Sequence, residues 1–212
     1  MGFVVAIDGP AASGKGTIAA RLGKALGLPV LDTGLLYRAV GATVLAAGGS
    51  LDDEAAAARV AADLKLEDLD DPALRGGAAG EAASRVAALP AVRTALIHFQ
   101  RAFAARDSGA ILDGRDIGTV IAPHARAKLF VTAAAPVRAE RRWLQLRETQ
   151  PDLSLAEVLA DIERRDARDS GREAAPLRRA QDAILLDTSE LDIDHAFDAA
   201  RRIVEAARGQ GS

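Results

Sequence analysis

The sequence predicts an α/β fold built on a mostly parallel sheet, and three observations support this prediction. Apolar runs of strand length alternate with longer segments of helical period, which is typical of stacked βαβ units. The runs are too uniformly apolar for a sheet that is wet on one face, so we expect helices on both faces. A glycine-rich loop directly follows the first run and opens the first helix.

Five strands and seven helices follow from this alternation. The predicted strands are Phe3–Asp8, Pro29–Asp32, Ala110–Asp113, Lys128–Thr132 and Ala183–Asp187. The predicted helices are Lys15–Leu26, Leu35–Ala47, Asp53–Leu64, Ala91–Arg106, Pro136–Glu148, Leu155–Asp169 and Ile193–Ala207. Leu64–Gly80 joins an acidic run to a Gly/Ala segment and predicts a small insertion or mobile loop, and Ser170–Gln181 is a second irregular zone.

The composition is that of an ordinary globular protein. The chain has 212 residues, enough for one sizeable core, with 49% hydrophobic and 27% charged residues and a net charge of −3. A nucleic-acid binder would usually be basic, so we expect no nucleic-acid partner. Cysteine is absent, which excludes disulfides and thiolate metal sites. The N-terminal apolar run is too short for a signal peptide or a membrane-spanning helix, so we expect a cytoplasmic protein with no membrane partner.

The loop after the first strand has the pattern of a phosphate-binding loop. Its residues are Gly9, Pro10, Ala11, Ala12, Ser13, Gly14, Lys15, Gly16 and Thr17. The glycines let backbone N–H groups turn toward a polyphosphate, and Lys15 would reach its β- and γ-oxygens. Gly16 stands directly after the lysine, where the common pattern has Ser or Thr, and Thr17 comes next. The alternative is a plain glycine turn between strand and helix.

Charged residues also follow the second and third predicted strands. Asp113 ends the third strand, where it could orient magnesium-bound water together with Thr17, and Arg115 could clamp a phosphate. After the second strand, Arg38 could hold an acceptor phosphate and Tyr37 could line the acceptor pocket. The alternatives are an Asp-Gly turn with a surface ion pair and a capped helix with an ordinary surface arginine.

Arginines are concentrated in the last third of the chain. They are Arg138, Arg141, Arg142 and Arg147 on one predicted helix and Arg164, Arg165, Arg168 and Arg172 at the end of the next. A mobile flap could bring these guanidiniums onto a triphosphate, exclude water and stabilise the transferring phosphoryl group. The alternative is a solvated helix hairpin with i,i+4 ion pairs. His98, His124 and His195 show no metal-ligand spacing, and we assign them no function.

Taken together, these segments resemble the bacterial cytidylate kinase family over nearly the whole chain. The resemblance is carried by Ile7–Thr17, Leu31–Gly34 with Tyr37 and Arg38, Ala83–Ala87, Asp113–Thr119, and Arg165–Asp169 with Ala175–Leu177. It implies a P-loop NTPase-like three-layer fold with a five-stranded parallel sheet, a small acceptor-binding insertion and a helical lid. It divides a single domain into a core (1–32, 107–136 and 182–208), an acceptor-binding region (33–106) and a lid (137–181).

The resemblance also implies an activity and a set of site residues. The activity is ATP-dependent phosphorylation of CMP and dCMP by in-line transfer, with Mg²⁺ accompanying ATP, in a monomeric enzyme. The catalytic residues would be Lys15, Arg115 and Arg165. The acceptor would be bound through cytosine by Ser84, Arg93 and Asp116 beside Thr33 and Tyr37, through the sugar by Arg165 and Asp169, and through phosphate by Arg38, Arg115 and Arg172.

Other readings compete with this one. A P-loop kinase for another small acceptor, such as shikimate or gluconate, would share the phosphate loop and the lid. A GTPase switch or a regulatory ATPase is a different class, and the chain contains no asparagine, so the guanine-reading Asn-Lys-x-Asp signature is excluded. A purely structural or binding role would predict no turnover with any monophosphate. Many members of the family carry a longer insertion before Ser84, so the region Leu64–Gly80 is abbreviated here, which affects how the acceptor region would close.

Overall fold

The structure is a computed structural model that describes residues 2–209, and it divides into two compact units. The sheet unit comprises residues 1–31 and 101–212, and the helical unit comprises residues 32–100. The finer division into core, acceptor region and lid stays a prediction. No helix within residues 2–209 is long and apolar enough to cross a membrane.

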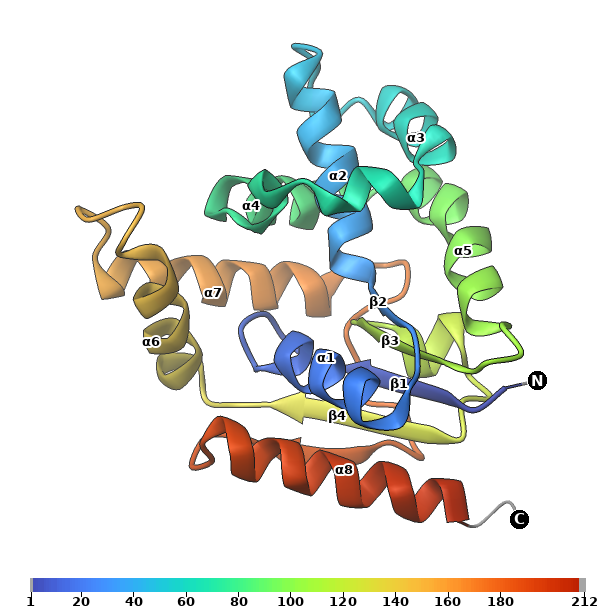
Figure 1. Cartoon of the computed structure of the whole chain (residues 1–212). Helices are drawn as coiled ribbons and strands as arrows, with labels where there is room; N and C mark the ends of the chain where they lie inside the picture. The colour runs from blue at the N-terminus through green and yellow to red at the C-terminus, as the bar shows by residue number, and fades with distance from the viewer. Residues whose placement is uncertain (1, 210–212) are drawn as a thin grey trace. The chain divides into compact units, whose positions relative to one another are not determined.

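The sheet unit is built on a parallel sheet of five strands in the order β2-β3-β1-β4-β5 (Figure 1). The strands are β1 (Val4–Asp8), β2 (Val30–Asp32), β3 (Ala110–Gly114), β4 (Ala127–Thr132) and β5 (Ile184–Asp187). On the central strand, Ile7 pairs with Asp113 on one side and with Leu129 on the other, both in parallel register. The predicted fold class and all five strands are therefore confirmed, with strand ends shifted by at most one residue.

Helices α1 (Lys15–Leu26) and α8 (Ile193–Gly209) pack against each other and against the strands. Their apolar faces bury Ile18, Leu22 and Val204 with Val5 and Ile7 in one core. The π-helical turn η3 (Ile117–Ile121) packs against β1 and β3. Helix coverage of the sheet is incomplete at its edge, where Ile184 and Leu185 on β5 are each 50% exposed, so the expectation of two covered faces holds only for the central strands.

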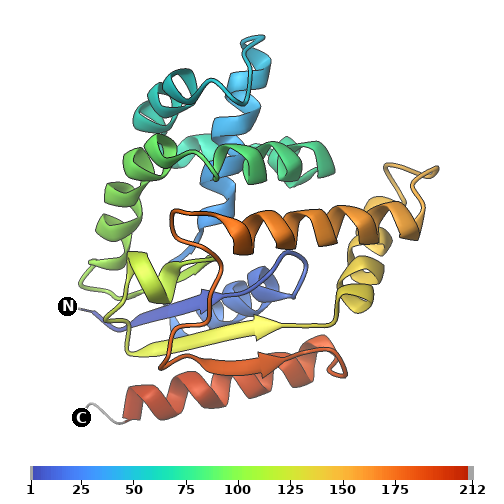
Figure 2. The ribbon, with the colours of Figure 1, turned by 180° about the vertical axis from the view of Figure 1, so that it is seen from behind.

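Two further helices of the sheet unit, α6 (Ala135–Leu146) and α7 (Leu155–Gly171), are joined by a loop and cross each other steeply where they pack together (Figure 2). A small core of Ala139, Val158 and Ile162 joins them, with the phosphate-loop residue Ala12 packed against it. Ser154 begins α7 with a capping box, because its hydroxyl accepts the Glu157 N–H while the Glu157 carboxylate accepts the Ser154 N–H. The segment 172–181 has no regular structure, as predicted.

The helical unit contains α2 (Thr33–Ala46), α3 (Glu54–Asp63), α4 (Gly77–Val86) and most of α5 (Pro90–Ala104). The prediction of a loop over Leu64–Gly80 is wrong, because two 3-10 helices (Leu66–Asp70 and Pro72–Arg75) and the first turn of α4 occupy it. Glycines have low helix propensity, but tertiary packing overrides it here. Leu69 and Leu74 are buried, and Gly41 on α2 lets α4 approach closely, since a Cβ there would lie 2.8 Å from Ala82 Cβ.

Candidate active site

The phosphate loop joins β1 to α1 at the carboxyl edge of the sheet, as predicted. Gly9 has a φ of 150°, and a Cβ there would lie 1.9 Å from the Val131 carbonyl oxygen, so only glycine fits. Ala12 (φ 59°) and Gly14 (φ 90°) are also left-handed. Left-handed residues between right-handed ones turn successive N–H groups to the same side, which creates a concave anion-binding backbone.

Lys15 lies at the first position of α1 and is buried, with only 5% of its surface exposed. Its ammonium donates a hydrogen bond to the Pro10 carbonyl (3.0 Å) and lies 3.7 Å from an oxygen of Asp113. A buried ammonium beside a helix N-terminus concentrates positive charge where a polyphosphate would bind. The phosphate-binding role of the lysine stays a prediction.

Asp113 lies on β3 and faces the first turn of α1. A Cβ on Gly16 would lie 3.4 Å from Asp113 Oδ2, so the position after the lysine points toward this carboxylate, whereas Thr17 is exposed. No group of three or more His, Cys, Asp or Glu side chains among residues 2–209 could hold a metal ion by itself. One carboxylate and one hydroxyl nevertheless suit Mg²⁺ that arrives with a nucleotide, because phosphate oxygens and water complete its coordination.

A second carboxylate, Asp8, is buried at the end of β1. Its two oxygens accept hydrogen bonds from the N–H groups of Ile117 and Gly118, each at 2.8 Å. Burial raises the pKa of Asp8 from 3.8 to about 7, and the nearby carboxylates of Asp116 and Asp113 add to the rise, while the two N–H donors oppose it. Asp8 thereby ties the strand before the phosphate loop to the turn that carries Asp116.

Four predicted residues come together between β3 and α7. The Nε of Arg115 donates to the carboxylate of Asp169 at 3.0 Å, and both side chains are largely buried. Burial alone would raise the pKa of Asp169, but Arg115, Arg172 and Arg165 hold it below its usual value. Burial, followed by repulsion from Arg115, lowers the pKa of Arg165. Of the described side chains, Arg165 is one of the few with a buried polar atom, Nε, that has no hydrogen-bond partner.

The predicted acceptor residues of the helical unit lie on α2, α4 and α5. The guanidinium of Arg93 lies 5.7 Å from the centre of the Tyr37 ring and donates to the Ala87 carbonyl, so these two predicted pocket residues are neighbours. Arg38 donates to the carbonyl of Leu74 at 2.7 Å. The buried Ser84 hydroxyl has no hydrogen-bond partner among residues 2–209. A buried polar atom without a partner is costly unless a ligand satisfies it.

Thr33, the last predicted residue of this unit, is buried at the first position of α2. The preceding Asp32 caps the helix by accepting the Gly34 N–H at 2.9 Å. Asp116, predicted to bind the same base, belongs to the sheet unit, where it is buried next to η3.

Comparison with known proteins identifies the family. A family model described as cytidylate kinase matches residues 5–206. The chain belongs to the cytidylate kinase family. The cytidylate kinase of Caulobacter vibrioides is 61% identical over 99% of both chains, and that of Azorhizobium caulinodans is 62% identical over 98% of this chain and 100% of its own. A solved structure of an uncharacterized protein from Eubacterium ventriosum shares the fold, with a TM-score of 0.57 and 13% identity over 97% of this chain and 99% of that one.

Two features of this cytidylate kinase family member are not predicted from its sequence. Asp8 is part of the Ile7–Thr17 segment, but no role is assigned to it, although an aspartate directly before the phosphate loop is a signal for one. Arg138 and Arg141 are assigned either to a mobile flap or to a solvated helix hairpin, and in the structure they donate hydrogen bonds to the Ala11 carbonyl and to the Thr188 hydroxyl. The partners of these two arginines lie far away along the chain, so local sequence does not show them.

Proposed function

We propose that this protein transfers the γ-phosphoryl group of ATP to CMP and dCMP, giving CDP and dCDP. The observation that carries the proposal is the buried Lys15 at a glycine-rich backbone concavity, in a chain that belongs to the cytidylate kinase family. The 61% identity to a curated cytidylate kinase over 99% of the chain supports the same acceptor class.

The chemistry needs charge stabilisation more than proton transfer. The acceptor phosphate of CMP is already an oxyanion, so in-line attack on the γ-phosphorus requires no dedicated general base. Lys15 would stabilise the negative charge on the β- and γ-oxygens during the transfer. Arg115 and Arg165 would stabilise the transferring phosphoryl group. The repulsion between Arg115 and Arg165 supports this assignment, because an anion between them relieves it.

We assign the acceptor to the residues that the family resemblance indicates. We assign cytosine to Ser84, Arg93 and Asp116, since a carboxylate accepts from the exocyclic amine of cytosine and repels the carbonyl of uracil. The unsatisfied Ser84 hydroxyl supports this assignment. The other assignments are Thr33 and Tyr37 beside the base, Asp169 and Arg165 on the sugar, and Arg38, Arg115 and Arg172 on the acceptor phosphate.

Mg²⁺ would accompany ATP. We assign Asp113 and Thr17 to hold it, through its water shell or directly. When bound, the ion neutralises charge on the β- and γ-phosphates. We further propose a monomeric enzyme of the cytoplasm. The absence of cysteine suits a reducing compartment, and light scattering would measure the mass in solution.

An acceptor panel tests the proposed function. Initial rates at fixed MgATP are measured with CMP, dCMP, UMP, AMP and GMP, and with shikimate and gluconate, through coupled detection of ADP. We expect CMP and dCMP to be phosphorylated well above the other three. Equal rates with UMP would remove the cytosine assignment, and turnover of shikimate or gluconate without CMP turnover would replace the acceptor class altogether.

A further inference from the structure

Three carbonyl groups of the phosphate loop accept hydrogen bonds from side chains. Lys15 donates to the Pro10 carbonyl at 3.0 Å, and Arg138 donates to the Ala11 carbonyl at 3.2 Å. The hydroxyl of Thr188 lies 3.2 Å from the Ser13 carbonyl. The last two donors come from α6 and from the residue after β5, so distant parts of the sheet unit fix the loop's peptide planes.

In a planar trans peptide, the carbonyl and the following N–H point in opposite directions. Holding the Ser13 carbonyl therefore aims the Gly14 N–H away from Thr188, and holding the Ala11 carbonyl aims the Ala12 N–H away from Arg138. Ala12 and Gly14 are also the left-handed residues of the loop. The donors thus maintain the peptide orientations that present N–H groups to an anion.

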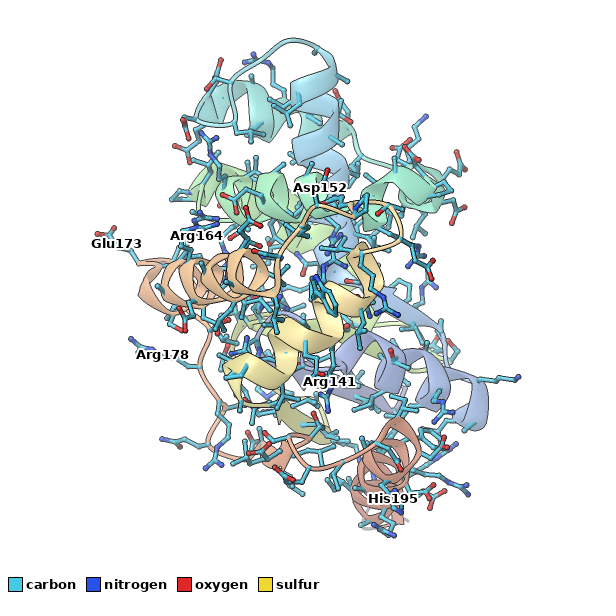
Figure 3. All side chains as sticks on the ribbon, turned by 90° about the vertical axis from the view of Figure 1, so that its left-hand side faces the viewer. Arg141, Asp152, Arg164, Glu173, Arg178 and His195 are labelled. Carbon is cyan, nitrogen blue, oxygen red and sulfur yellow. The ribbon has the colours of Figure 1, made fainter. Side chains whose placement is uncertain are left out.

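Thr188 is itself oriented by Arg141 on α6. One guanidinium nitrogen of Arg141 donates to the Thr188 hydroxyl at 3.0 Å, and the other donates to the carbonyls of Thr188 (2.7 Å) and Leu191 (3.2 Å). Figure 3 shows Arg141 between α6 and the N-terminal end of α8, where His195 is labelled.

An arginine only donates, so the Thr188 hydroxyl proton must point to a carbonyl instead. The two within reach are Ser13 (3.2 Å) and Thr132 (3.1 Å), and the Thr132 carbonyl already accepts the backbone N–H of Thr188 at 2.8 Å. Arg141 occupies an acceptor position of the hydroxyl and so directs its proton toward these two carbonyls, of which the Ser13 carbonyl belongs to the phosphate loop.

We propose that Thr188, oriented by Arg141, is a positioning residue for the triphosphate of the donor nucleotide, acting through the Ser13–Gly14 peptide. Arg138 acts in the same way at Ala11. Arg138 also forms a two-pronged ion pair with Asp166 on α7, with distances of 3.1 and 2.6 Å. Arg138 and Arg141 therefore hold the conformation of the phosphate loop, and they do not belong to a flap that closes onto the triphosphate. The proposal rests on the proposed function only in taking ATP as the ligand.

The test compares three threonine variants by calorimetric titration with MgATP and by steady-state kinetics. Thr188→Val removes the hydroxyl at nearly constant volume, Thr188→Ser keeps it, and Thr149→Val is the control. Thr149 also has a hydroxyl bonded to a carbonyl, that of Leu146, but it is exposed at the end of α6. We expect Thr188→Val to weaken MgATP binding about fivefold to tenfold, as one lost hydrogen bond predicts. Thr188→Ser and Thr149→Val should bind within about twofold of the parent protein on the same basis.

Kinetics separate positioning from general loss of structure. The KM for ATP should rise in Thr188→Val with the KM for CMP unchanged at saturating ATP, whereas a global defect would move both. Unchanged MgATP affinity in folded Thr188→Val would overturn the proposal. If that variant does not fold, Arg141→Met provides the test. We expect it to bind MgATP about threefold more weakly, and an unchanged affinity would contradict the proposal. A parent protein that binds MgATP but leaves CMP unphosphorylated would contradict only the proposed function.

Discussion

Asp8 gives the protein a pH-dependent stability that a single substitution should remove. Its carboxyl is buried against the N–H groups of Ile117 and Gly118, and its pKa is raised from 3.8 to about 7. Between these values the folded protein holds a proton that the unfolded chain has released. Stability therefore falls as the pH rises through this interval, because folding takes up a proton.

The size of the effect follows from the two pKa values. Each unit between the folded and unfolded pKa corresponds to about 1.4 kcal/mol. With the folded pKa at about 7, raising the pH from 5 to 8 should lower the free energy of unfolding by about 3 kcal/mol through Asp8 alone. Asp116 and Asp113 are the other carboxylates that act on Asp8, and both favour its protonated form.

Urea unfolding, followed by circular dichroism at pH 5, 6, 7 and 8, measures this slope in the parent protein and in Asp8→Asn. The asparagine stays neutral, so the drop of about 3 kcal/mol between pH 5 and pH 8 should be absent, whatever the variant's absolute stability. Glu157→Gln is the matched control. Hydrogen bonds from Ser154 lower the pKa of Glu157 from 4.5, so its own contribution is lost only as the pH falls below that range. Identical slopes for the parent protein and Asp8→Asn would refute the reasoning.

Three other substitutions test separate parts of the structure. Lys15→Met should reduce kcat by about 100-fold or more with the fold retained, because it removes the cation next to the phosphates; a near-normal rate in a coupled ADP assay would contradict this role. Asp116→Ala should weaken discrimination between CMP and UMP, and an unchanged ratio of kcat/KM values would exclude Asp116 from the base pocket. Gly41→Ala should destabilise the helical unit by about 1–3 kcal/mol in thermal unfolding, because its Cβ would lie 2.8 Å from that of Ala82; an unchanged Tm would show that α2 and α4 can separate freely.

Local sequence was sufficient for the elements that depend on local chemistry. All five strands were predicted within one residue at each end, and α1 was predicted at its observed bounds. Apolar periodicity and the loop pattern are properties of a few consecutive residues, so they can be recognised without knowing which residues pack against them. The prediction failed over Leu64–Gly80, where buried Leu69 and Leu74 support helical turns that the glycines disfavour.

The sequence by itself determined the five strands, the helices other than α4, the phosphate loop and the residue types around it. Only the tertiary structure decided which polar groups meet. Asp8 bonds to Ile117 across 109 residues, and Thr188 reaches the Ser13 carbonyl across 175. A buried polar group needs a hydrogen-bond partner. Which residue becomes that partner depends on which strand ends the parallel sheet places next to each other. The roles of Asp8, Arg141 and Thr188 therefore emerge only when the sheet is assembled.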